Sequence, residues 1–188
     1  MSDKSEIRKH VKTVLKNLSP YKKFTFSGRI QAAAINIKQF KKARSIMIFM
    51  ALGDEPQTDK IISAALSKGK KVYIPKVDGD DLLVTELAPD TVFEKNKWDI
   101  AEGGALTDKR DFDLIFVPLV AFDGNLNRMG RGKGYYDRFL KQAKGVKVGL
   151  AFCCQRADEL PVEEHDVPLD IIVTEQYTIG RLNENNIG

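Results

Sequence analysis

Residues 113–140 read DLIFVPLVAFDGNLNRMGRGKGYYDRFL. Within this stretch the sequence pattern changes from that of a strand to that of a helix, and this change decides the fold class. Its first six residues, DLIFVP, form a short apolar run of the kind that predicts a buried strand. Residues 135–144, YYDRFLKQAK, carry apolar side chains at helical spacing and predict a helix. A strand, a loop and a helix in succession are the repeating unit of α/β domains.

The rest of the chain continues this alternation. Apolar residues at three- and four-residue steps predict a helix from Ser5 to Ser19-Pro20, and further helices are expected over 27–42 and 58–69. Additional strands are predicted at residues 45–51, 71–75, 82–87, 146–152 and 170–175. The pattern predicts an α/β domain with a largely parallel central sheet flanked by helices. Because no repeat or linker interrupts the pattern, residues 1–188 are expected to form a single domain.

The composition is that of a soluble globular protein, and the charge leaves the type of partner open. The 188 residues carry a net charge of +4, which suits an anionic small molecule as well as a nucleic acid. No apolar run is long enough to span a bilayer, and the N-terminal residues lack a secretory signal, so the cytoplasm is the expected compartment. The adjacent Cys153 and Cys154 are expected to be buried thiols, and no cluster has the spacing of a zinc site.

The glycine-rich segment between strand and helix predicts a binding site for an anion. Glycines at 130, 132 and 134 allow backbone N–H groups to approach a ligand closely, at the positive end of the following helix. Arg128, Arg131 and Lys133 add positive charge, and a polyphosphate matches this combination. The spacing is neither that of a Walker loop nor that of a dinucleotide fingerprint, and a tight turn without a ligand is the alternative.

The first turn of the helix after the glycines adds three polar side chains. Asp137 is favourable there on electrostatic grounds alone, and its functional interpretation is a ligand of a phosphate-bound Mg²⁺. Tyr136 falls on the apolar stripe of the predicted helix. Tyr135 does not, so we expect it to be the freer of the two to contact a ligand.

The stretch NRMGRGKGYYDRFL (127–140) strongly resembles the 5-formyltetrahydrofolate cyclo-ligase family, also called methenyltetrahydrofolate synthetases. The resemblance covers nearly the whole chain. It includes the K-x-x-x-R pattern at Lys4 and Arg8, IFMALGDEPQT (48–58), KWDI (97–100), DLIFVPLVAFD (113–123) and LPVEEHDVPLD (160–170).

This resemblance implies an α/β sandwich fold related to sugar-phosphate isomerases and coenzyme A transferases. It also implies a reaction in which 5-formyltetrahydrofolate becomes 5,10-methenyltetrahydrofolate, with ATP as co-substrate, Mg²⁺ as metal, and ADP and phosphate as further products. Folate and ATP would be the partners, with neither nucleic acid nor membrane involved and a monomer favoured.

Site residues also follow from the resemblance. It assigns ATP binding to Lys4, Arg8, Arg128, Met129, Gly130, Arg131, Gly132, Lys133, Gly134, Tyr135 and Tyr136. It assigns folate binding to Met50, Glu55, Arg131, Gly132, Lys133, Gly134 and Tyr135. Arg131 and Lys133 would stabilise the charge of the transferring phosphate, and Asp137 and Asp166 would bind Mg²⁺.

Each of these residues has a simpler interpretation. Lys4 and Arg8 could lie on a solvated helix face, Glu55 in an acidic turn, and Trp98 in the core instead of against the folate ring. Alternating Arg, Lys, Gly and Tyr also suits single-stranded RNA, although nearby acids would repel its phosphates. A coenzyme A or sugar-phosphate enzyme on the same fold is a third possibility.

Overall fold

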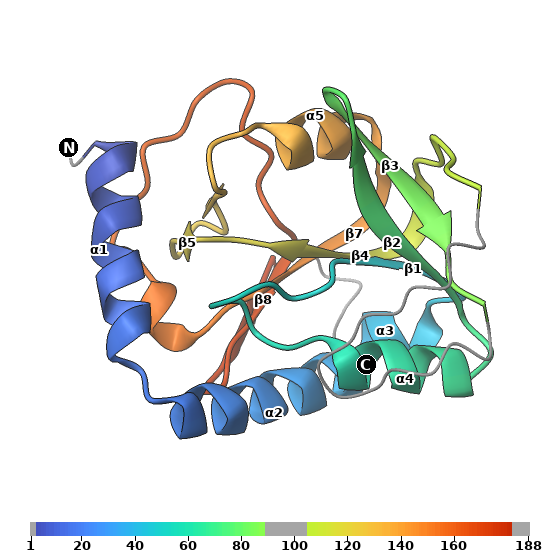
Figure 1. Cartoon of the computed structure of the whole chain (residues 1–188), viewed down its shortest axis with the longest axis horizontal. Coiled ribbons are helices and arrows are strands. Elements are labelled where there is room, and N and C mark those ends of the chain that lie inside the picture. Colours follow the sequence, from blue (N-terminus) through green and yellow to red (C-terminus); the bar gives the residue numbers. More distant parts are fainter. Residues whose placement is uncertain (1–2, 89–104, 182–188) are drawn as a thin grey trace.

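The structure is a computed structural model that describes residues 3–88 and 105–181. Within these ranges a seven-stranded sheet forms the centre of the molecule, with helices on both faces (Figure 1). Its strands lie in the order β3 (Asp81–Glu86), β2 (Lys71–Asp78), β1 (Ser45–Ile48), β4 (Asp111–Pro118), β7 (Lys144–Leu150), β8 (Ile171–Val173) and β9 (Thr178–Gly180).

The five inner strands are parallel, and the two edge strands are antiparallel to their neighbours. In the register of the centre, Ile46 of β1 lies opposite Val72 of β2 and Leu114 of β4. The prediction of a mixed α/β fold with a largely parallel sheet is therefore confirmed.

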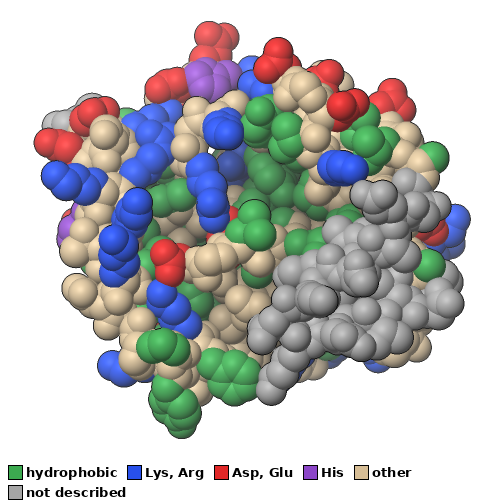
Figure 2. Space-filling view, in the orientation of Figure 1, with side chains coloured by type: hydrophobic (Ala, Val, Ile, Leu, Met, Phe, Trp, Pro, Cys, Tyr) green, Lys and Arg blue, Asp and Glu red, His purple; other side chains and the backbone are tan. Residues whose placement is uncertain are grey.

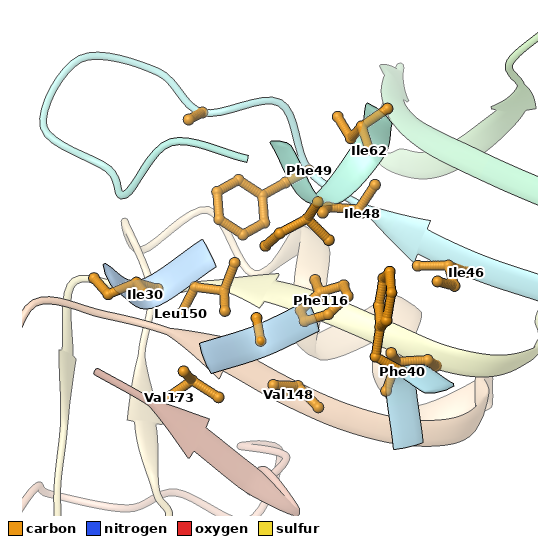
Figure 3. Close-up of a cluster of buried hydrophobic side chains, with 14 of the residues drawn as sticks. Ile30, Phe40, Ile46, Ile48, Phe49, Ile62, Phe116, Val148, Leu150 and Val173 are labelled. Carbon is orange, nitrogen blue, oxygen red and sulfur yellow. The ribbon is translucent and has the colours of Figure 1, made fainter. Parts of the chain in front are cut away.

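Alternate residues of the strands enter two different cores. One core packs the sheet against α2 (Pro20–Asn36), α3 (Lys38–Lys42) and α4 (Asp59–Ser67). Figure 3 shows Ile46, Ile48 and Phe116 from the sheet meeting Ile30 and Phe40 of these helices. The other core packs Met47, Ile115 and Val117 against α5 (Tyr135–Gln142). This period of two is the pattern expected of strands with helices on both faces.

The N-terminal helix, α1 (Lys4–Asn17), stands at one end of the sandwich (Figure 1). It buries Val11 and Leu15 in the first core. Its other neighbours are β5 (Ala121–Phe122) and the short 3₁₀ helix η1 (Cys153–Gln155). The strand β5 pairs with β6 (Arg128–Met129) in a small hairpin outside the main sheet.

The second predicted helix was placed wrongly. It begins at Pro20, not at Ser27, because Ser19 accepts a hydrogen bond from the Lys22 N–H and proline suits the first helical position. The Ser19-Pro20 pair both ends one helix and starts the next. The same predicted helix is interrupted at Ile37, whose extended backbone separates α2 from α3.

Several strand boundaries also differ from the prediction. The strand predicted at 45–51 ends at Ile48, and the strand β9 was not predicted at all. Trp98 and the KWDI segment lie outside the described residues. No helix in residues 3–88 or 105–181 has the length and apolar character needed to cross a membrane.

The two edges of the sheet differ in how they end. On the outer side of β3, Val84 exchanges backbone hydrogen bonds of 3.0 and 2.9 Å with Thr107. At the other edge, β9 has only three residues.

Candidate functional site

The site lies where the carboxyl ends of β1 and β4 meet. The chain leaves β1 towards α4 and the next strand β2 on one side, and it leaves β4 towards α5 and β7 on the other. In parallel sheets such a change of direction opens a crevice between the two outgoing loops, where ligands bind. Here the loops are residues 49–58 and 119–134.

An ion pair joins the two loops. The Arg131 Nη2 lies 2.8 Å from the Glu55 Oε1, and the Leu52 N–H donates to the Glu55 Oε2 at 2.9 Å. The Glu55 side chain is only 13% exposed, whereas that of Arg131 is 61% exposed. The guanidinium therefore lies between this carboxylate and the solvent.

The helix α1 contributes Lys4 and Arg8 from one face. The Arg8 Nε donates to the Gly130 carbonyl at 3.0 Å, and the Lys4 ammonium lies 2.9 Å from Asp166 and 3.0 Å from Glu163. Desolvation lowers the pKa of Lys4, but the hydrogen bonds to Asp166 and Glu163 outweigh it and raise the pKa. Both cations are partly buried, so the alternative of a solvated basic face does not describe them.

Arg128 is the most buried cation of the group, with a side chain that is 2% exposed. Its Nη2 donates to the Asp137 Oδ1 at 2.5 Å, and its Nε has no hydrogen-bond partner within the described ranges. Burial lowers the pKa of Arg128, while the charges of Asp137 and, more weakly, Asp166 raise it. A buried guanidinium with an unsatisfied N–H is a group that a further anion would complete.

The three glycines have different backbones. Gly132 and Gly134 have positive φ angles of 95° and 70°, whereas Gly130 does not lie in that region. A methyl group at Gly132 would lie 3.4 Å from the Arg8 guanidinium. Lys133, between the two left-handed glycines, is exposed, and no acid of the described residues pairs with it. Its ammonium is thus available to a ligand.

The two tyrosines lie side by side at the start of α5. Both are partly buried and pack against the second core, so the expectation that Tyr135 is the freer of the two to contact a ligand stays a prediction. Arg138 covers the Tyr135 ring, and Arg128 lies 5.9 Å from the centre of the Tyr136 ring. Burial, followed by the charge of Glu55, raises the pKa of the Tyr136 hydroxyl.

The surface around these residues is hollowed. Figure 2 shows Lys and Arg side chains gathered on the α1 side of the hollow and hydrophobic side chains deeper within it, below α5. Positive charge beside an apolar recess suits a ligand with an anionic part and a flat, poorly charged part.

Comparison with known proteins identifies the family of the chain. The profile of the 5-formyltetrahydrofolate cyclo-ligase family matches residues 1–175. The chain belongs to this family. A 5-formyltetrahydrofolate cyclo-ligase of Haemophilus influenzae is 31% identical over 90% of this chain and 97% of its own, and one of Mus musculus is 31% identical over 93% and 94%.

A solved structure of the family has the same fold. The NMR structure of 5,10-methenyltetrahydrofolate synthetase from Aquifex aeolicus matches with a TM-score of 0.81 and 32% identity, covering 96% of this chain and 93% of that one. The resemblance of the glycine segment to the cyclo-ligases is therefore confirmed at the level of the family.

Both acids that the cyclo-ligase resemblance assigns to Mg²⁺ are engaged with cations. Asp137 pairs with Arg128, and Asp166 pairs with Lys4. These two contacts connect α5 and the 160–166 segment to the cations of the site. Residues 3–88 and 105–181 contain no group of three or more His, Cys, Asp or Glu side chains that could hold a metal. Two carboxylates fit a Mg²⁺ that is carried by phosphates and waters, and they do not fit an all-protein metal cage.

Sequence reasoning missed Asp123. This fully buried carboxylate accepts hydrogen bonds from the backbone N–H groups of Asn125, Asn127 and Leu160 and from the Asn127 amide, at 2.9–3.1 Å. It ties the β5–β6 turn to the segment that precedes Asp166. The signal was present in DGNLN, because an aspartate that opens a turn commonly binds the N–H two residues later.

Proposed function

We propose that this protein converts 5-formyltetrahydrofolate to 5,10-methenyltetrahydrofolate in the cytoplasm, with ATP as co-substrate and Mg²⁺ as the metal. Membership of the cyclo-ligase family and the names of the relatives support the reaction. The use of ATP agrees with the clustering of Lys and Arg side chains around a glycine segment and a helix start. Mg²⁺ agrees with two carboxylates placed beside those cations.

The observation that carries the proposal is the convergence of five separate segments on one group of charges. They are α1, the loop after β1, the glycine segment after β4, the first turn of α5, and residues 160–166. Each carries a residue that the cyclo-ligase resemblance assigns to ATP, folate or metal. A structural ion-pair network alone does not explain the buried, unsatisfied Arg128 Nε.

The chemistry explains why the site holds charges and lacks an obvious nucleophile. The formyl oxygen is a poor leaving group and must first be activated. It would attack the γ-phosphorus of ATP, with ADP as the leaving group. N10 of the folate then attacks the formyl carbon and loses its proton to solvent, and the oxygen leaves with the phosphate as inorganic phosphate. The protein must hold the phosphate in line with the formyl oxygen and stabilise its charge.

The charged residues divide between these tasks. Arg131 and Lys133, with the N–H groups of the glycine segment, would stabilise the transferring phosphate, and Lys4, Arg8 and Arg128 would hold the rest of the nucleotide. Mg²⁺ held by Asp137 and Asp166 would neutralise phosphate charge.

The folate would lie on the other side of the Glu55–Arg131 ion pair. Glu55 would accept N–H groups of the pterin ring, and Met50 would contact the ring itself. Glu55 is held in place for this role by the N–H of Leu52, at 2.9 Å. The substrate carbon would then face the glycine segment across the crevice.

The main competing function, binding of single-stranded RNA, fits the charges less well. Each of Arg128, Arg131 and Lys4 has an acid as its partner, and these acids lie inside the basic group. A polynucleotide would have to bring phosphates past all of them without a metal.

An absorbance assay tests the proposal. The protein is incubated with 5-formyltetrahydrofolate and Mg-ATP, and methenyltetrahydrofolate is followed spectroscopically. We expect product only when both ATP and Mg²⁺ are present. Lys133→Ala should lower turnover about tenfold or more, whereas Lys76→Ala, an exposed lysine on β2, should not change it. If no product forms at any of the pH values and temperatures tried, the proposal is overturned.

A further inference from the structure

The Glu55–Arg131 ion pair joins a residue proposed for folate to a residue proposed for the phosphates of ATP. Glu55 comes from the loop after β1 and Arg131 from the glycine segment after β4, and their side chains meet at 2.8 Å. In this arrangement Arg131 occupies the carboxylate that the pterin would bind, and Glu55 occupies the guanidinium that the phosphate would bind. The carboxylate can present itself fully to a pterin ring only after the guanidinium moves away.

We propose that this ion pair couples the binding of the two substrates, so that each one strengthens the binding of the other. A phosphate that takes Arg131 releases Glu55 for the pterin, and a pterin that takes Glu55 releases Arg131 for the phosphate. The inference rests on the proposed function, because it concerns the two ligands of that same site.

The coupling follows from a thermodynamic cycle. Either ligand alone must separate the pair and bears the full cost of doing so. When both ligands are bound the pair is separated only once, so the second ligand binds without that cost. The effect must be equal in both directions, because coupling free energies are reciprocal. A partly exposed ion pair with one well-held carboxylate gives a coupling of about two- to fivefold in affinity.

Other ion pairs of the site do not have this property. Arg128 and Asp137 are both assigned to the nucleotide and its metal, and Arg128 is almost completely buried. Lys4 pairs with Asp166 and Glu163, of which none is proposed to contact folate. Among the described ion pairs of the site, Glu55–Arg131 is thus the one that bridges the two ligands.

Calorimetry with a non-hydrolysable nucleotide provides the test. The dissociation constant of Mg-AMP-PNP is measured for the wild type with and without saturating 5-formyltetrahydrofolate. We expect the folate to lower this constant about two- to fivefold. Glu55→Gln should already show the lowered constant without folate, because Gln keeps the size of the side chain but releases Arg131.

Asp54→Asn is the matched control. It removes the same charge from the neighbouring position, but Asp54 pairs with Lys23 and not with Arg131, so nucleotide binding should stay as in the wild type. An equal gain in nucleotide affinity in both variants would show a general effect of the removed charge and overturn the inference. A wild type whose nucleotide affinity does not change with folate would overturn it as well. In either case turnover would persist, whereas failure of the proposed function would appear as absence of turnover.

Discussion

Gly130, Gly132 and Gly134 alternate with cations in one stretch, but the structure gives them different roles. The φ angles of Gly132 and Gly134 are ones that side-chain-bearing residues rarely adopt, and Gly134 also immediately precedes α5. Gly130 has an ordinary φ angle, and its carbonyl accepts a hydrogen bond from Arg8. The backbone of this segment is thus fixed both by its own turns and by α1.

Gly132→Ala should damage stability and ATP use together. The left-handed backbone should cost about 1 kcal/mol of unfolding free energy, and the new methyl group would contact the Arg8 guanidinium in the proposed phosphate site. We expect turnover to fall about tenfold or more under conditions where the protein is folded. Thermal unfolding, nucleotide binding and the absorbance assay measure the three quantities.

Gly79→Ala is the matched control for backbone strain. Gly79 has a positive φ of 58° in the β2–β3 turn, and a methyl group there would meet nothing within 4 Å. It should lose stability and keep normal ATP use. Normal ATP use in Gly132→Ala as well would mean that this glycine serves only the turn.

Residue types in the site were easier to predict than their partners. The cations of the glycine segment and the acids around them are visible in the sequence, together with the family that they resemble. Their assignments to ATP, folate and metal stay predictions. What the sequence could not show is that Arg128 is buried against Asp137, or that Glu55 pairs with Arg131, because these contacts depend on how distant segments pack.

The helix α1 illustrates how one element is held by the site. Its apolar face enters the first core, while Lys4 and Arg8 bind the 163–166 segment and the glycine segment. Desolvation raises the pKa of Asp166, but hydrogen bonds from Lys4 and from the Glu163 N–H outweigh it and lower the pKa. The contact between α1 and this segment should therefore depend on pH.

Asp166→Asn should destabilise the protein by about 1 kcal/mol at pH 7. A carboxyl whose pKa is lowered by folding contributes stability above its unfolded pKa, and the contribution disappears as the pH falls through the folded value. The difference from the wild type should consequently shrink between about pH 5 and pH 2. Denaturant unfolding at several pH values measures it.

Asp158→Asn changes an exposed acid that lies just before residues 160–166 and has no ion pair among the described residues. It should leave the stability almost unchanged at both ends of the pH range. A constant destabilisation of Asp166→Asn down to pH 2 would show that its charge is not the cause.

At this scale the inner strands were predicted well because each is an apolar run bounded by polar residues. The failures have local causes. Residues 27–42 contain a helical pattern on both sides of Ile37, so the break was invisible, and β9 is too short to give a periodic signal. The relation to sugar-phosphate isomerases and coenzyme A transferases stays a prediction, as does the single-domain assignment.

At the scale of the whole molecule, the site connects segments from both ends of the described chain. Ligand binding should therefore stabilise the whole fold. Mg-ATP at a hundred times its dissociation constant should add about 2.7 kcal/mol to the unfolding free energy and raise the melting temperature by about 5–10 °C. Hydrogen exchange should slow at the same time in α1, in residues 119–134 and in residues 160–166.

Adenosine at the same concentration is the control, since it lacks the phosphates that the cations would bind. It should give a much smaller shift of the melting temperature. Protection confined to one of the three segments would show that the nucleotide does not engage the converging charges.

The way the sheet ends has a consequence for assembly at high concentration. An open strand edge is a template onto which a second chain can add a strand, and native proteins avoid this with short or covered edges. Here the outer side of β3 already shares its central hydrogen bonds with Thr107, and β9 offers only three residues. Growth of the sheet from one molecule into the next is thus disfavoured at both edges. Among the described residues, these two edges of the main sheet therefore offer little room for strand pairing between copies of this protein.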